Sequence, residues 1–189
     1  MVSGGVYCWG TNEDGALGID NLDITMRSGP VSLPSLNNIR QVAGGAHGHT
    51  CAVGDDNQTW CWGSNSWGQV GNDSNVNQHR PARVQGLGSA AMVALSAWTT
   101  CALVANSVYC WGENEFEQIG DGTTIPRLTA TIPYPGLVPA DQVTTISDGV
   151  CVLSDDEEIW CWGHNASGRL GPLATTDPSP AVQVPITCD

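Results

Sequence analysis

A Cys-Trp-Gly triplet that returns about every fifty residues constrains this chain more than any other feature. Each copy follows a Tyr or Trp and precedes an Asn-containing turn, in VYCWGTNEDG, TWCWGSNSWG, VYCWGENEFE and IWCWGHNASG. The triplet cysteines are 53, 49 and 51 residues apart, at Cys8, Cys61, Cys110 and Cys161. This period is typical of propellers and solenoids, in which each repeat is one supersecondary unit. We expect a single repeat domain spanning 1–189, with units of approximately 1–56, 57–105, 106–156 and 157–189.

A second cysteine precedes three of these triplets by nine or ten residues. The segment between the two cysteines, TCAVGDDNQTWC for example, has apolar ends and a polar middle, which indicates a β-hairpin. Cysteines that face each other across such a hairpin have Cα atoms about 5 Å apart, which is within disulfide range. The predicted disulfides are Cys51–Cys61, Cys101–Cys110 and Cys151–Cys161.

Two cysteines lack a partner within a hairpin. Cys8 has no cysteine-bearing strand before it in the sequence, and no triplet follows Cys188. We therefore expect a Cys8–Cys188 disulfide that fastens the ends of a ring, which would protect open sheet edges. The alternative is a dimer in which Cys8 of one chain pairs with Cys188 of another.

The triplet strands carry aromatic residues on one face. Because residues i and i+2 of a strand share a face, Trp60 and Trp62 point one way and Cys61 points the other. We expect these aromatics to form the core between stacked blades. The Asn of each following turn is expected to bond its own backbone in an Asx-turn. Glu117 replaces the turn glycine of the other copies, so this position should be strained or differently folded.

Composition supports an all-β fold and excludes some partners. The chain has 23 Gly and 11 Pro among many Val, Thr and Trp, a composition that favours short strands and turns. Its six Lys and Arg against 19 Asp and Glu give a net charge of −13, which argues against nucleic acid and anionic membranes. No apolar run approaches the roughly 20 residues of a membrane span.

The repeats resemble those of the regulator of chromosome condensation family. The resemblance rests on CWGSNSWGQVG, on QVAGGAHGHTCAV and on the Pro-bearing stretch between such motifs, and it covers essentially the whole chain. The cysteines are similar to those of a bacterial style of these repeats. The resemblance implies a β-propeller. Family propellers typically have seven blades, so four units imply either a small closed ring or part of a larger ring.

The side chains with chemical potential indicate a binding function rather than catalysis. The cysteines recur with the architecture and include no C-x-x-C pair, so neither a metal site nor a catalytic cysteine is expected. No cofactor is expected, and no nucleophile elbow, P-loop or paired-carboxylate motif is present. Disulfides indicate a secreted or periplasmic protein. We expect a non-enzymatic module that binds a protein partner; the alternative is a lectin-like propeller. The candidate contact residues are Trp67, His79 and Phe116.

Overall fold

The computed structural model describes residues 4–20, 25–133 and 139–185. Within these ranges the structure is built from strands, with one 3-10 helix, η1 (Ala166–Gly168). The short strands follow from the sequence, because turn residues recur too often for a long helix and alternation favours β pairing. The prediction of an all-β fold is confirmed.

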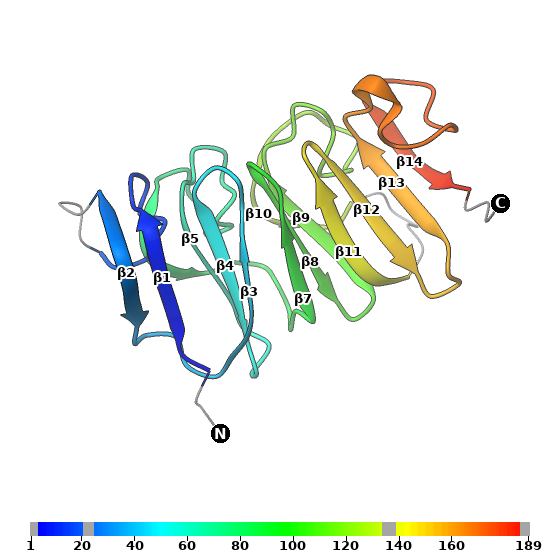
Figure 1. Ribbon diagram of the computed structural model, residues 1–189. Helices are drawn as coiled ribbons and strands as arrows, with labels where there is room; N and C mark the ends of the chain where they lie inside the picture. The colour runs from blue at the N-terminus through cyan, green and yellow to red at the C-terminus, as the bar shows by residue number, and fades with distance from the viewer. Residues whose placement is uncertain (1–3, 21–24, 134–138, 186–189) are drawn as a thin grey trace.

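The strands form three four-stranded antiparallel sheets and one two-stranded sheet, which we call blades (Figure 1). Blade 1 consists of β1 (Val6–Thr11) and β2 (Met26–Leu33). Blade 2 consists of β3 (Ile39–Gly44), β4 (His49–Gly54), β5 (Thr59–Gly63) and β6 (Gln78–Arg83). Blade 3 consists of β7 (Met92–Leu95), β8 (Thr99–Val104), β9 (Ser107–Gly112) and β10 (Arg127–Thr131). Blade 4 consists of β11 (Ala140–Ile146), β12 (Gly149–Ser154), β13 (Ile159–Gly163) and β14 (Ser179–Val184).

The blades form an open array rather than a ring of four. Strand order in space follows strand order in sequence in every four-stranded blade, and blades 1 and 4 lie at opposite ends of the array (Figure 1). Each four-stranded blade combines two strands from one sequence repeat with two from the next. Blade 1 has only the triplet strand β1 and the Pro-bearing strand β2. The alternative of a small closed ring is therefore wrong, and the array has the form of part of a larger propeller.

The cysteine pairs fix the register in the middle of each complete blade. Each pair lies directly opposite on neighbouring strands, with a Cα–Cα distance of 4.1 Å and a disulfide bond, in Cys51–Cys61, Cys101–Cys110 and Cys151–Cys161. The predicted hairpin tips also form, since β4–β5 turns at residues 55–58 and β12–β13 turns at residues 155–158. The hairpin interpretation of the repeats is thus confirmed.

Cys8 holds the same place on β1 as these cysteines hold on their strands. It lies opposite Val31 of β2, is half-buried and makes no disulfide within the described residues. Burial raises the pKa of its thiol above the usual value. Cys188 lies outside the described residues, so the Cys8–Cys188 disulfide stays a prediction.

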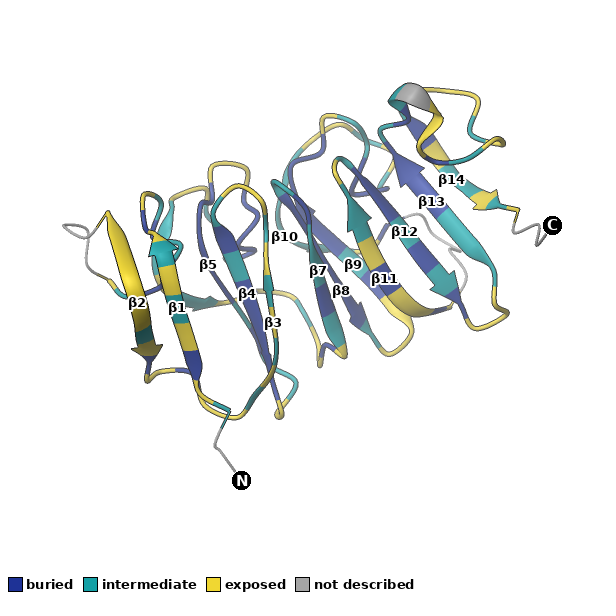
Figure 2. Ribbon diagram, in the orientation of Figure 1, coloured by how far each residue is buried: buried dark blue, intermediate teal, exposed yellow. Residues whose placement is uncertain are grey.

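The hydrophobic core consists of three clusters, each between two neighbouring blades. The clusters centre on Trp62, Trp111 and Trp162, whose side chains are fully buried. The blade-to-blade interpretation of the triplet aromatics holds for these three. It is wrong for blade 1, where Tyr7 is 59% and Trp9 is 62% exposed because the described residues place no blade against β1 (Figure 2).

The glycine of the triplet allows the chain to leave the sheet. Gly63 has a φ of +97°, and a Cβ atom there would lie 2.1 Å from the carbonyl oxygen of Gly48. A larger residue therefore has neither the backbone conformation nor the space that this position requires. The pairing of β5 with β6 also shifts register between Cys61 and Gly63. The chain consequently departs at this point into the long loop that follows each triplet.

Candidate functional site

The long loops lie at one end of the blades, which we call the loop end. It carries the loops that follow the triplet strands of blades 2, 3 and 4, at 64–77, 113–126 and 164–178, which we call the second, third and fourth loops. It also carries the short turns at 45–48, 96–98 and 147–148. Figure 1 shows these connections along the upper side of the array. The opposite end carries the disulfide-bonded hairpins and the links between blades. The loop end thus combines a constant frame with the most varied segments of the sequence.

The turn asparagines brace these loops from within. In the second loop, Asn65 is fully buried, its Oδ1 accepts from the Val70 amide at 2.9 Å, and its Nδ2 donates to the Ser74 and Val76 carbonyls at 2.9 and 3.0 Å. Asn114 and Asn165 make the equivalent bonds. Each side chain therefore spans its whole loop. The turn motif predicted a local Asx-turn. Instead, the Asn65 Oδ1 accepts from the amide of Val70, five residues ahead.

The third loop forms the same turn despite its glutamate. Glu117 adopts a φ of +56°, where Gly68 has +81°, and its amide donates to the Asn114 carbonyl at 3.1 Å. The left-handed conformation costs a non-glycine residue roughly 1 kcal/mol. The prediction of strain at Glu117 is confirmed, and the fold of the loop is kept.

A cluster of carboxylates surrounds one histidine between the third and fourth loops. We call Glu113, Asp148, His164 and Asp177 the acidic cluster. The His164 ring nitrogens lie 3.5 Å from an Asp148 oxygen and 3.6 Å from an Asp177 oxygen, which are ion-pair distances. One face of the His164 imidazole stacks on the Phe116 ring, with ring centroids 4.2 Å apart. The cluster thus joins residues from blades 3 and 4.

Glu113 is the most perturbed member of the acidic cluster. It is only 5% exposed, and Gln118 Nε2 donates to its Oε2 at 3.3 Å. Burial, followed by the negative charges of Asp148 and Glu115, raises its carboxyl pKa to about 7. A carboxyl with this pKa changes charge near neutral pH, so the electrostatics of this region of the loop end depend on pH.

A hollow of about 300 Å³ opens at the loop end and is lined by residues of blades 1, 2 and 3. Its lining includes two carboxylates, Glu13 and Asp14, and the stacked rings of His47 and Trp98, whose centroids are 4.2 Å apart. Asp14 is held in place by a 2.8 Å hydrogen bond from Asn77 Nδ2. Carboxylates beside an aromatic face suit a Lys or Arg side chain, which gains both ion-pair and cation–π contacts.

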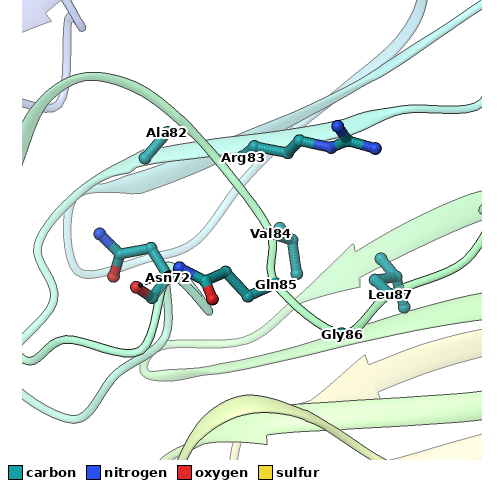
Figure 3. Close-up of a pocket in the computed structure, with 7 residues that line it drawn as sticks. All are labelled: Asn72, Ala82, Arg83, Val84, Gln85, Gly86 and Leu87. Carbon is teal, nitrogen blue, oxygen red and sulfur yellow. Dashed lines mark hydrogen bonds between the residues drawn. The ribbon is translucent and has the colours of Figure 1, made fainter.

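A larger hollow of about 620 Å³ lies beside the segment that leaves β6. Figure 3 shows the Asn72 and Gln85 side chains close together and the Arg83 side chain extended away from them. The Gln85 Nε2 donates a hydrogen bond to the Asn72 carbonyl at 3.2 Å. The lining has no carboxylate and no aromatic ring, so this hollow offers fewer specific contacts than the loop end.

The three predicted contact residues have different surroundings. Trp67 lies on the second loop and is 40% exposed. Phe116 occupies the same position of the third loop, but its ring is engaged by His164. His79 lies on a strand, β6, and is half-buried against the turn at Gly15. Only Trp67 combines a loop position with a largely free ring.

Sequence reasoning missed the acidic cluster and the hollow. Glu113 reaches the three blade 4 members of the cluster only through the packing of neighbouring blades, and the hollow likewise combines segments from different blades. One signal was present, because Glu113 and His164 follow their triplets at the same position, where Ser64 stands in blade 2. In the described part of the chain, no group of three or more His, Cys, Asp or Glu side chains is placed to hold a metal ion. The described helix is also far too short to cross a membrane.

The sequence matches the family model described as Regulator of chromosome condensation (RCC1) repeat over residues 3–53 and 56–103, which is more than half of the chain. The chain belongs to the RCC1 repeat family. The blades, the turn asparagines and the triplet tryptophans are therefore parts of an RCC1-type propeller.

Individual relatives agree with this assignment. The probable E3 ubiquitin-protein ligase HERC6 of Homo sapiens is 31% identical over 92% of this chain and 18% of its own length. The ultraviolet-B receptor UVR8 of Arabidopsis thaliana is 27% identical over 97% of this chain and 42% of its own length.

Solved structures show the same fold. Human WBSCR16 superposes with a TM-score of 0.85 at 20% identity, over 96% of this chain and 47% of its own. Prp20p of Saccharomyces cerevisiae superposes with a TM-score of 0.80 at 18% identity, over 97% of this chain and 47% of its own. The chain spans less than half the length of each of these four relatives.

Proposed function

We propose that the chain is a non-enzymatic protein-interaction module that presents its loop end to a basic protein surface. The observation that carries this proposal is the hollow lined by Glu13, Asp14, His47 and Trp98. It suits a basic side chain, and the acidic cluster on the same end adds further carboxylates. Prp20p, which has a similar fold, binds Gsp1p and histones, and this supports a protein partner for this chain.

The proposed setting is an oxidising compartment, either outside the cell or in a periplasm. Its support is the set of three disulfides, one in each four-stranded blade. Such bonds form and persist where thiols are not kept reduced. They would hold the frame of the loop end rigid while the loops make the contacts.

A pair of charge-reversal variants tests where the partner binds. We choose purified core histones as a basic protein probe and calorimetry as the measurement. The first variant, E13K/E115K, reverses two exposed carboxylates at the loop end. The matched control, D55K/D155K, reverses two exposed carboxylates at the tips of the disulfide hairpins. Both variants change the net charge by the same amount, so a nonspecific charge effect would weaken binding equally.

The proposal predicts about a thirtyfold loss of affinity for the loop-end variant and little change for the control, because two rim charges contribute on the order of 1 kcal/mol each. Binding should also weaken as salt is raised. Equal losses in the two variants, or no binding of the probe at low salt, would contradict the proposal.

Carbohydrate binding is the second candidate, and the exposed ring of Trp67 is the observation that favours it. An exposed indole offers a flat apolar face on which a sugar ring can stack. Binding to a defined glycan on an array, abolished by Trp67→Ala but kept in E13K/E115K, would establish this function in place of the first.

A further inference from the structure

Neighbouring blades are joined at the loop end by one repeated contact. The indole Nε1–H of each buried triplet tryptophan donates to a carbonyl in the loop of the preceding blade. The three bonds are Trp62 to Ala16 at 2.9 Å, Trp111 to Gln69 at 2.9 Å and Trp162 to Gln118 at 3.1 Å. Each acceptor lies four residues after the turn asparagine of its loop.

A glycine two residues after each acceptor makes room for the ring. A Cβ atom on Gly18, Gly71 or Gly120 would lie 3.0 Å or less from the indole of the following blade. The carbonyl and the glycine together form a socket, and the tryptophan is the plug that fills it.

A second contact accompanies the plug at two of the junctions. The amides of Asp20 and Asp73 donate to the carbonyls of His79 and Leu128, at 2.7 and 3.1 Å. Each acceptor is the second residue of the last strand in the following blade, β6 or β10. A junction therefore joins two points of one loop to two strands of the next blade.

Blade 4 presents an unfilled socket of this kind. The equivalent positions are the carbonyl of Arg169, then Gly171, then the amide of Leu173. Among the described residues, only Val184 of the same blade lies within 4 Å of a Cβ atom placed on Gly171. The Leu173 side chain is 55% exposed. No hydrogen bond to the Arg169 carbonyl or from the Leu173 amide forms within the described ranges.

At the other end of the array, blade 1 presents a plug that enters no socket among the described residues. Trp9 occupies the triplet position of Trp62 but is 62% exposed. Ser28 is the residue of β2 that corresponds to His79, because Arg27 pairs with Gly10 as Gln78 pairs with Gly63. Ser28 is also exposed. The two halves of a junction thus stand at opposite ends of one chain.

We propose that blade 1 of one copy docks on blade 4 of a second copy through this junction. Trp9 of one copy lies over Gly171 of the other and donates its Nε1–H to the Arg169 carbonyl. The Leu173 amide donates to the Ser28 carbonyl. The interface continues the one that joins the blades within the chain, so each contact has a counterpart between neighbouring blades of one copy.

The docking contact joins unlike surfaces of the two copies. One copy superposes on 47% of the WBSCR16 chain and 47% of the Prp20p chain. A contact between unlike surfaces generates either a closed ring or an open filament. Two copies together have nearly the length of one such propeller, and a closed pair fills both sockets.

Analytical ultracentrifugation of the full chain over a range of concentrations tests the docking. We expect a species of twice the 19.8 kDa chain mass in the wild type. Trp9→Ala should be monomeric with an unchanged circular dichroism spectrum. Trp67→Ala removes another exposed indole, outside the junction, and should associate like the wild type. A wild type that stays monomeric at its highest soluble concentration, or association that survives in Trp9→Ala, overturns the proposal.

Hydrogen exchange locates the interface independently of any variant. Peptides that contain Arg169 to Leu173 and peptides from β1 should become protected as the concentration rises. The hairpin at residues 55–58 serves as the internal control and should not change. Concentration-dependent protection confined to segments outside blades 1 and 4 would also overturn the proposal, because it would place the contact elsewhere.

Discussion

The indole of Trp111 in blade 3 donates a 2.9 Å hydrogen bond to the carbonyl oxygen of Gln69 in the loop that follows β5. Both groups are buried, and the same carbonyl accepts a 2.8 Å bond from Thr100 Oγ1. His49 Nε2 lies 3.1 Å from that hydroxyl. One loop carbonyl thus ties together two blades, so the position of each loop is set by the blade that follows it.

Trp111→Phe should destabilise the fold by about 2–3 kcal/mol, because the smaller phenyl ring leaves a cavity at a fully buried position and one of two bonds to the Gln69 carbonyl is lost. Urea unfolding measures the change. Trp67→Phe is the matched control, since that indole is 40% exposed, and its cost should be within about 0.5 kcal/mol. Equal effects of the two changes would mean that the buried bond contributes nothing.

Glu117→Gly should stabilise the chain by roughly 1 kcal/mol, because the left-handed φ of +56° is unfavourable for glutamate and free of penalty for glycine. The reciprocal change Gly68→Ala should destabilise by more than this. Its Cβ atom would lie 2.9 Å from the Leu128 Cα, which adds a steric clash to the unfavourable backbone. Thermal unfolding compares the two; a lower melting temperature for Glu117→Gly would refute the strain argument.

Asn114→Asp should cost on the order of 3 kcal/mol. The change keeps the acceptor for the Ile119 amide but replaces a donor to the Thr123 and Ile125 carbonyls with an oxygen, in a fully buried site beside Asp121. Asn75→Asp, on the exposed tip of another loop, is the control and should be nearly neutral. A small effect at Asn114 would show that the loop does not depend on its brace.

Some features of the fold and of the candidate site can be predicted from the sequence, and others cannot. The fifty-residue period predicts the strands, and the spacing of Cys51 and Cys61 predicts their register, because both are local to one hairpin. The acidic cluster and the exposure of Trp9 depend on how one blade lies against another, or on whether any blade lies there. The brace at Asn65 was misassigned for a related reason, since the length of the loop that it spans cannot be read from a turn motif.

Two buried groups should give opposite dependences of stability on pH. Burial, followed by the charge of His47, lowers the His49 pKa from 6.5 to about 4. Between these values the unfolded chain binds the proton and the folded chain does not, so acidification destabilises the fold by up to about 3 kcal/mol. Glu113 has the opposite sign: its folded pKa of about 7 exceeds the unfolded 4.5, so acidification from pH 7 to 4.5 stabilises the fold.

Single substitutions separate these two effects. Relative to the wild type, His49→Gln should gain unfolding free energy as the pH falls from 7 to 4.5, because its own loss is removed. Glu113→Gln should lose unfolding free energy over the same interval. Urea titrations at the two pH values give both differences. Parallel changes in the two variants would show that at least one of these groups titrates normally.

Every complete blade has the same strand register, in which the triplet cysteine forms a disulfide with the cysteine on the preceding strand. Peptide mapping of the unreduced protein by mass spectrometry tests it most directly. We expect three crosslinked peptides, Cys51–Cys61, Cys101–Cys110 and Cys151–Cys161, in stoichiometric amounts. Free thiols at these six positions, or a bridge between cysteines of different blades, would contradict it.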